Sequence, residues 1–262
     1  MAGSLSDFAE LELLDHVLKV GEYSQPANIY VALSTADPGE SGAGIAEPVG
    51  NGYARVAHNT WDVATSRATK NTGVITFAEA SGSWGVITHF AIFDHVDAGN
   101  MLAYGELSAS KTIGAGDDAS FAAGAIDISF NAGGISDYLA NELLDHLFKT
   151  GAYTVPTHIY VGLSTADPTD DGSGIIEPGE NYARKEFDTW NVAAAGASSN
   201  DGAIEFVQAD ASWGTITYFF LSDGAAANGD NMLFRAAVDA AKAVGNGDTA
   251  KFDDETLFIT LT

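Results

Sequence analysis

The spacing of apolar residues changes from a helical to a strand-like period near residue 25. Before that point, apolar side chains recur at steps of three and four residues, at Phe8, Leu11, Leu14 and Leu18. Ser6 precedes this stripe as a favourable N-cap, and Gly21 follows it as a stop signal. The pattern predicts an amphipathic helix of about four turns, whose apolar face must pack against another element.

Beyond residue 25 apolar and polar residues alternate with a period of two, which is typical of strands. The segments with this pattern are 29–33, 53–63, 74–77, 86–93, 101–107 and 125–130. Glycine-rich joints such as Gly114–Asp117 separate them. One helix followed by about six or seven short strands predicts a mainly β fold, a β-sandwich with the helix packed on one face or end.

The whole pattern occurs twice. Residues 5–131 align with residues 135–262 almost end to end, at an offset of 129 to 131. The matches include Ile29–Pro38 with Ile159–Pro168, Tyr53–Arg55 with Tyr182–Arg184, Trp61 with Trp190, Ser83–Gly85 with Ser212–Gly214 and Asn100–Leu102 with Asn231–Leu233. A repeat of this length is domain-sized rather than a solenoid unit. We therefore predict two tandem domains, residues 1–131 (repeat 1) and 132–262 (repeat 2), joined by the short segment Asn131–Gly134.

The charge balance restricts the possible partners. Asp and Glu number 36 against 11 Lys and Arg, so the formal net charge is −25, and no basic patch interrupts the acidity. Such a surface repels phosphate, which argues against nucleic acid as a partner. The chain has no Cys, which excludes disulfides and zinc–thiolate sites. We expect no secretory signal in the first residues and no membrane span, and hence synthesis in a cytoplasm.

Histidine is a weak candidate for catalysis in this sequence. The dipeptides Asp15-His16 and Asp145-His146 are duplicated, but neighbours on a helix point about 100° apart. A capping, surface or subunit-contact role is therefore favoured for them. The remaining histidines are not duplicated: His58, His89, His95 and His158 align with Phe187, Tyr218, Gly224 and Asn28. We expect no catalytic histidine.

Two acidic segments have the oxygen density that calcium prefers, residues 167–174 and 253–255. The first lacks the EF-hand spacing, and its counterpart in repeat 1 carries fewer acids, so solvated turns are favoured over weak calcium binding. Gly82–Gly85 has the wrong spacing for a nucleophile elbow. We predict no catalytic, cofactor-binding or metal-binding residue, and no enzyme activity. Trp84 and Trp213 are expected to cap the core at a corner.

The string of motifs shared by the two repeats resembles a known family. It runs from the helix through Ile29–Pro38, an acidic Gly-rich loop, Ile45-x-Glu47-Pro48 and Tyr53-Ala54-Arg55 to Ser83–Gly85 and Asn100–Leu102. This string is similar to small virion structural proteins of tailed phages, known as phage tail fibre proteins. The family supplies no catalytic residues to carry over. The repeats differ at Phe234-Arg235, where repeat 1 has Ala103-Tyr104.

The resemblance implies a structural protein located in the virion. Its expected partners are capsid or tail proteins of the same particle and further copies of itself. Duplication would let three chains satisfy a pseudo-sixfold site, so a homotrimer is one possible assembly. The absence of long coiled-coil or repetitive β stretches favours a capsid-decorating or particle-surface adaptor protein. A tail fibre, collar or receptor-binding tail component is the alternative.

Overall fold

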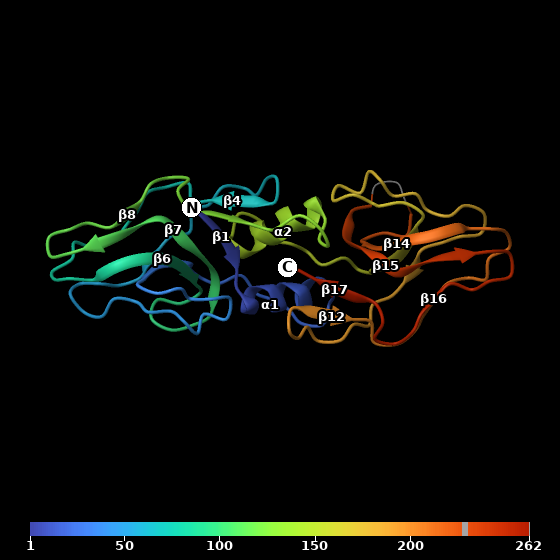
Figure 1. Ribbon diagram of the computed structural model, residues 1–262, viewed down its shortest axis with the longest axis horizontal. Helices are drawn as coiled ribbons and strands as arrows, with labels where there is room; N and C mark the ends of the chain where they lie inside the picture. The colour runs from blue at the N-terminus through green and yellow to red at the C-terminus, as the bar shows by residue number, and fades with distance from the viewer. Residues whose placement is uncertain (227–229, 262) are drawn as a thin grey trace. The chain divides into compact units, whose positions relative to one another are not determined.

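The computed structural model describes residues 1–226 and 230–261, and this part of the chain is mainly β with two helices (Figure 1). The elements of repeat 1 are β1 (Ala2–Leu5), α1 (Asp7–Val17), β2 (Tyr30–Ser34), β3 (Val56–Ala57), β4 (Ala68–Lys70), β5 (Ile75–Thr76), β6 (Gly85–Phe93), β7 (Met101–Ile113), β8 (Ser120–Phe121) and β9 (Asp127–Ser129). Those of repeat 2 are α2 (Asp137–Leu147), β10 (Tyr160–Ser164), β11 (Lys185–Glu186), β12 (Ala197–Ser199), β13 (Ile204–Glu205), β14 (Gly214–Ser222), β15 (Met232–Val244), β16 (Lys251–Phe252) and β17 (Phe258–Thr260). Neither α1 nor α2 combines the length and the apolar character that a membrane crossing requires.

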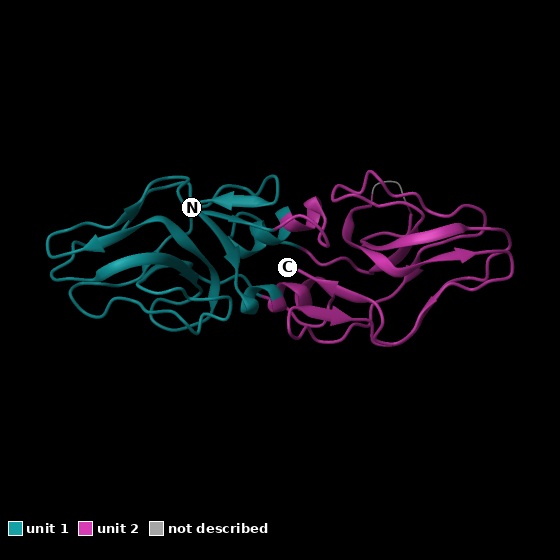
Figure 2. Ribbon diagram, in the orientation of Figure 1, with its two compact units in different colours: residues 1–10, 24–130, 141–153 teal, residues 11–23, 131–140, 154–262 magenta. Residues whose placement is uncertain are grey.

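Two compact units make up the chain, and each combines segments of both repeats (Figure 2). Unit 1 comprises residues 1–10, 24–130 and 141–153, and unit 2 comprises residues 11–23, 131–140 and 154–262. Each unit therefore contains the strands of one repeat together with the C-terminal part of the helix of the other repeat. Independent folding of the segments 1–131 and 132–262 stays a prediction.

Unit 1 is organised around a seven-stranded sheet with the order β3-β2-β6-β7-β1-β9-β4. Its centre is the antiparallel pair β6 and β7, which runs from Gly85 opposite Ile113 to Phe93 opposite Met101. A bulge between Ile87 and His89 bends this pair, as bulges do. Strand β1 pairs antiparallel with β7 and parallel with β9, so the N-terminal residues join the two parts of the sheet.

Unit 2 repeats the central sheet as β11-β10-β14-β15, with separate pairs β12–β17 and β13–β16. The place taken by β1 in repeat 1 is marked here by a single bridge between Ile135 and Phe234. The Arg235 N–H also donates to the Gly134 carbonyl at 2.7 Å. The segment after the joint thus contacts β15 as β1 contacts β7, but over fewer residues.

The tryptophan after each Ser in Ser-Trp-Gly is buried, as predicted. Trp84 is 4% exposed, and its ring meets Tyr53 edge to face with the centroids 5.4 Å apart. Its indole N–H donates to the Asn51 carbonyl at 2.9 Å, so the polar end of the ring is satisfied. Trp213 has the same relation to Tyr182, at 5.3 Å. These pairs tie the loop that carries the tyrosine to the start of β6 or β14.

The predicted fold class is confirmed: the chain is mainly β and consists of two tandem β-sandwich domains, each preceded by one helix. The helices are shorter than predicted, at 11 residues each. Lys19 and Lys149 take φ values of 64° and 66°, and this left-handed conformation ends each helix before the glycine that the sequence marked as the stop.

Strand boundaries differ from the prediction more than helix positions do. The segment 53–63 holds only the short strand β3 and a bridge at Trp61. Strands β1, β4 and β8 were not predicted, because segments of two to four residues are too short to show a period of two.

Candidate functional site

The motifs that repeat in the sequence meet around a buried arginine in each unit. In unit 1 the Arg55 guanidinium binds the Glu47 carboxylate, with Nη2–Oε1 at 2.6 Å and Nε–Oε1 at 3.0 Å. The Tyr53 hydroxyl donates to Glu47 Oε2 at 2.8 Å and accepts from the Leu33 N–H at 2.9 Å. The guanidinium carbon lies 3.5 Å from the centroid of the Phe93 ring. The Glu-Pro and Tyr-Ala-Arg motifs thus form one cluster on β2 and β6.

Unit 2 contains the same cluster with one more carboxylate. Arg184 binds both oxygens of Glu177, with Nε–Oε1 at 2.9 Å and Nη2–Oε2 at 3.0 Å. Its Nη1 donates to Asp230 Oδ2 at 3.2 Å and to the Ser222 hydroxyl at 2.9 Å. The Arg184 side chain is 4% exposed. Burial strengthens such charge-assisted hydrogen bonds, and each carboxylate compensates for the desolvated guanidinium.

The tyrosines of these clusters are structural hydrogen-bond partners. Burial raises the pKa of Tyr53 above its usual value, and the neighbouring Glu47 carboxylate raises it further. Burial likewise raises the pKa of Tyr182. Both phenols therefore keep their protons at neutral pH and donate to glutamate. Because both phenols keep their protons, neither is available as a base. The role of these motifs is to attach a loop to a sheet.

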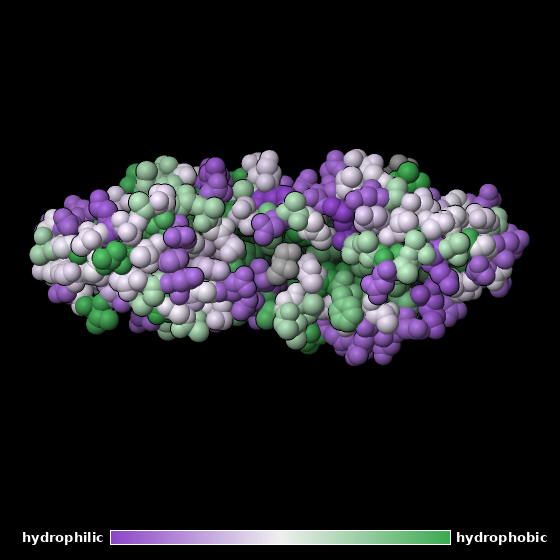
Figure 3. All heavy atoms as spheres, viewed as in Figure 1, coloured by the Kyte–Doolittle hydropathy of each residue, from purple (hydrophilic) through white to green (hydrophobic). Residues whose placement is uncertain are grey.

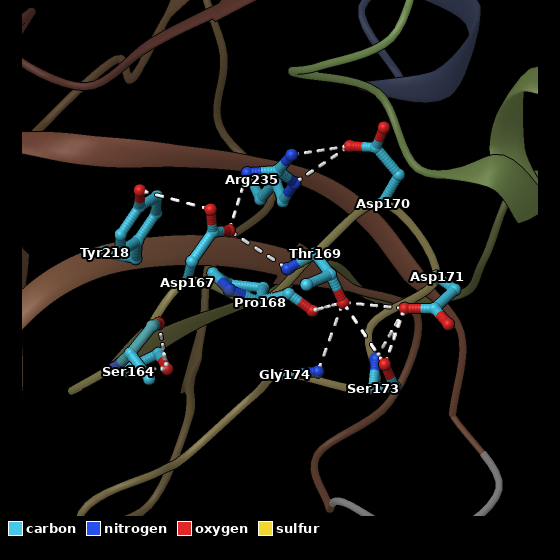
Figure 4. Close-up of polar contacts among 11 residues, drawn as sticks. Ser164, Asp167, Pro168, Thr169, Asp170, Asp171, Ser173, Gly174, Tyr218 and Arg235 are labelled. Carbon is cyan, nitrogen blue, oxygen red and sulfur yellow. Dashed lines mark hydrogen bonds and ion pairs between the residues drawn. The ribbon is translucent and has the colours of Figure 1, made fainter.

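The acidic loop of repeat 2 is bound internally and by Arg235 of β15 (Figure 4). Arg235 Nη1 lies 2.7 Å from Asp167 Oδ1, and its Nη2 lies 2.6 Å from Asp170 Oδ1. Asp171 Oδ1 accepts from the hydroxyls of Thr169 and Ser173 at 2.6 and 2.8 Å. The hydrogen bond from Thr169 and those from Ser173 lower the pKa of Asp171 to about 2. At least one carboxylate oxygen of each of Asp167, Asp170 and Asp171 thus has a protein partner.

The difference between the repeats at Arg235 is matched by a difference in its loop. Repeat 1 has Tyr104 at this position, and its loop carries Glu40 where repeat 2 has Asp170. Burial and the nearby carboxylates, Glu40 among them, raise the pKa of Tyr104. The cation in repeat 2 and the neutral phenol in repeat 1 give the two loops different local charge.

A cavity of ≈ 340 Å³ lies beside this loop in unit 2. Its lining includes the carboxylates of Asp170, Asp171, Glu177 and Asp230 and the guanidinium of Arg184. With four acids and one base among these residues, the cavity is acidic. Arg184 is already bound to Glu177 and Asp230, so its guanidinium is not available to a ligand that enters the cavity.

The second acidic segment also serves as a turn. Lys251 Nζ lies 2.6 Å from Asp253 Oδ1, and Asp254 Oδ1 accepts from the Gly202 N–H at 2.7 Å. The Asp253 carbonyl accepts from the Asn200 side-chain amide at 2.7 Å. These bonds hold the turn before β17, and they account for the density of acids there.

The duplicated Asp-His pairs are helix-docking residues. In unit 2, Asp15 Oδ1 accepts from the Ala193 N–H at 2.6 Å, and in unit 1 Asp145 Oδ1 accepts from the Ala64 N–H at 2.7 Å. His16 and His146 are buried. The Nδ1 of His146 accepts from the Tyr153 N–H at 3.1 Å. The aspartate and the histidine of each pair therefore bind different groups, as expected for neighbours on a helix.

The unduplicated histidines lie in separate surroundings. His58 Nε2 lies 2.9 Å from the Thr60 carbonyl, and burial lowers the pKa of His58. His89 lies 3.8 Å from Asp37, and His95 lies 2.8 Å from Asp97. These three histidines therefore bind three different partners.

The sequence interpretation missed a cluster around His158. Among the described residues, His158, Glu186 and Asp188 form the one group of three metal-capable side chains within 4.8 Å. His158 Nδ1 lies 2.8 Å from Asp188 Oδ2 and 3.2 Å from Glu186 Oε1. Lys19 Nζ lies 3.1 Å from Asp188 Oδ1. The sequence signal for this cluster was the pair of acids Glu186 and Asp188, which lie two positions apart at the end of β11.

This cluster is best described as an ion-pair network. Burial opposes ionisation of Asp188, but hydrogen bonds from the Ile159 N–H, His158 and Lys19 outweigh it and lower its pKa. The Lys19 ammonium already neutralises Asp188, which disfavours a second cation there. Repeat 1 has Asn28, Ala57 and Asn59 at the three positions, so the network is specific to unit 2.

One protein-family model matches each of the two repeats separately. Residues 4–129 and residues 134–260 each match the family model of the podophage GP4 fiber I protein gp80. The chain belongs to this family. No match was found among the curated proteins. The gp80 match confirms the resemblance to phage fibre proteins and the tandem duplication, and it supports a structural role in a virion.

Proposed function

We propose that this gp80-family chain is a non-enzymatic structural subunit of a phage particle and belongs to its tail fibre apparatus. The match of each repeat to a fibre protein carries the proposal. The family motifs agree with it, because Glu47, Tyr53 and Arg55 bind one another and fix a loop instead of presenting reactive groups. The partners are other virion proteins and further copies of the chain.

The surface supports contact through polar loops rather than through a large apolar face. Hydrophilic residues are spread over the visible face of each unit (Figure 3). The exposed large apolar residues are mostly valines, and Val49 is the most exposed at 91%. The acidic cavity beside Asp171 favours a partner with basic side chains. The net charge of −25 also keeps particles dispersed.

Capsid decoration is the second candidate, and the shortness of the elements is compatible with it. In the described part of the chain each helix has 11 residues and the longest strands have 13. A fibre shaft is built from long coiled coils or long repetitive β structure. Compact domains of short elements suit an adaptor or a decoration protein as well as the tip or base of a fibre.

Quantitative mass spectrometry of purified particles, separated into heads and tails, tests the proposal. A few copies per particle in the tail fraction would support the fibre assignment. Abundance near that of the major capsid protein in the head fraction would overturn it in favour of decoration, and absence from both fractions would overturn any virion role. The native mass of the released protein checks the trimer that we propose for a pseudo-sixfold site.

A further inference from the structure

Each compact unit combines the strands of one repeat with the end of the helix of the other repeat. Unit 1 contains residues 141–153 of repeat 2, and unit 2 contains residues 11–23 of repeat 1. Both exchanged segments span the C-terminal half of a helix and the turn after it. The exchange is reciprocal, since each repeat gives a helix end and receives one.

In unit 1 the received segment makes polar contacts with the loops of repeat 1 along its length. Asp145 Oδ1 accepts from the Ala64 N–H at 2.7 Å, and Asn141 Oδ1 accepts from the Arg67 N–H at 2.9 Å. Gln25 Nε2 donates to the His146 carbonyl at 2.9 Å. The Asp145 and Asn141 side chains thus satisfy backbone N–H groups of repeat 1, and the Gln25 amide satisfies a carbonyl in the last turn of α2.

Unit 2 receives the C-terminal part of α1 with the matching contacts. Asp15 Oδ1 accepts from the Ala193 N–H at 2.6 Å. Lys19 Nζ donates to the Thr157 carbonyl at 2.6 Å and pairs with Asp188. The Asp15 and Asp145 contacts are equivalent in the alignment, so the same docking geometry occurs in both directions.

Most apolar side chains of the two exchanged segments are buried. Those with 0% or 1% exposure are Leu13, Leu14, Val17, Leu18, Leu143, Leu144, Leu147 and Phe148. The Phe148 ring lies 4.5 Å from the Trp61 ring, centroid to centroid, so repeat 1 supplies the surface that covers it. Burial of side chains of this size stabilises the association through the hydrophobic effect. A repeat without its partner's helix would expose Trp61 and leave its own helix uncovered.

We propose that the helix-receiving surface around Trp61 and Ala64 in repeat 1, and around Trp190 and Ala193 in repeat 2, is an association surface for a second copy of the repeat. The occupant is the helix end of that copy, with its Asp-His pair and its apolar residues. The duplication places both partners in one chain. The gp80 model covers a single repeat and matches twice, so the repeat is the unit that this association joins.

Cutting the intact folded chain at the joint tests this association. Residues 131 and 132 are exposed, so a protease site inserted between Ala132 and Gly133 permits cleavage after folding. We expect the two halves to stay together at the mass of the uncut chain in native mass spectrometry. Separation into two folded particles of half the mass would overturn the proposal.

Cross-linking shows whether retained halves are joined by exchanged helices. The chain has no Cys, so Lys19→Cys with Asp188→Cys creates one defined pair in the cut protein. A short bismaleimide should link the halves into a full-mass band on a denaturing gel. The control pair, Lys19→Cys with Asn59→Cys, lies within one half and should leave half-mass bands. Half-mass bands alone from the Lys19→Cys with Asp188→Cys pair would show that α1 does not dock on repeat 2 and would overturn the exchange.

A single substitution measures the strength of the association. Asp145→Ala leaves the Ala64 N–H without its acceptor. We therefore expect the dissociation constant of the cut halves to rise about tenfold. Glu22→Ala, at an exposed position after α1, is the matched control and should change dissociation less than twofold. Equal effects of both substitutions would contradict docking through Asp145. These results do not depend on the particle fraction that contains the protein, so they stand apart from the test of the fibre role.

Discussion

The Asp145 carboxylate accepts a hydrogen bond from the Ala64 backbone N–H at 2.7 Å, although 81 residues separate them. Asp15 makes the equivalent bond to Ala193 at 2.6 Å. Both bonds belong to the duplicated Asp-His dipeptides. Their role is to position the end of a helix on a loop of the other repeat, so the duplicated Asp-His sequence is explained by folding rather than by chemistry.

Asp145→Ala should lower the stability of the intact chain. The Ala64 N–H would lose its acceptor in a half-buried place, which costs about 1–3 kcal/mol of unfolding free energy. Chemical denaturation followed by Trp fluorescence measures the change. Asp145→Asn keeps a side-chain oxygen and should lose less, and Glu22→Ala should lose nothing measurable. An Asp145→Ala variant as stable as the control would contradict the docking role.

Arg184→Met should be among the most destabilising substitutions in unit 2. It removes the guanidinium that compensates Glu177 and Asp230 in a buried cluster, and such a loss costs about 3–5 kcal/mol. Arg184→Lys should not restore the wild-type stability, because an ammonium cannot bind both oxygens of Glu177 in parallel. Unfolding in denaturant measures both variants. Lys185→Met changes the next, exposed residue, and a loss as large as that of Arg184→Met would refute the assignment.

Glu10→Ala should alter the pH dependence of stability. Burial, then the charges of Glu40 and Asp7, raise the pKa of Glu10 from 4.5 to about 7. A raised carboxyl pKa favours the folded state below about pH 4.5, and this contribution is lost as the pH rises through about 7. Repeat 2 has Ala140 at this position, so alanine suits the helix.

The variant should therefore gain stability relative to the wild type at pH 8, by about 1 kcal/mol once the half-exposed state of Glu10 is taken into account. At pH 4 this gain should vanish. Thermal unfolding of both proteins at pH 4, 6 and 8 measures the difference. A difference that is the same at all three pH values would show that Glu10 titrates normally.

The sequence predicted the helices, the long strands and the duplication, but not the exchange of helix ends. The stripe at Leu14 and Leu18 shows that a helix must pack on something, and two copies with nearly the same apolar surface satisfy that requirement equally well. Contacts between residues 81 or 178 positions apart, such as Asp15 with Ala193, leave no periodic signal. The choice between the two copies is thus made by tertiary packing.

Many residues of the candidate site could also be recognised from the sequence, but their contacts could not. The Tyr-Ala-Arg and Glu-Pro motifs were visible because they repeat, yet only the fold brings Arg55 against Glu47. Arg235 stood out as a difference between the copies, but its pairing with Asp167 and Asp170 depends on where β15 passes the loop. The His158 network lacks a counterpart in repeat 1, so comparison of the repeats argued against it.

Thr169→Gly should raise the pKa of Asp171. Thr169 has a φ of 60°, a conformation that a β-branched residue adopts rarely, and repeat 1 has Gly39 there with a φ of 63°. The Thr169 hydroxyl is the largest of the hydrogen-bonding contributions that hold the pKa of Asp171 at about 2. Glycine fits the backbone but removes that hydroxyl, so the pKa should move toward 3.8.

Titration of the side-chain carboxyl carbon by NMR measures this shift. Thr169→Ser keeps the hydroxyl and should leave the pKa of Asp171 near its wild-type value, which makes it the matched control. Ser173→Ala removes a weaker contribution and should give a smaller rise than Thr169→Gly. An unchanged pKa in Thr169→Gly would mean that the hydroxyl does not bind Asp171 in solution. The carboxylate would then be free for a cation, and calcium binding by this loop would have to be considered again.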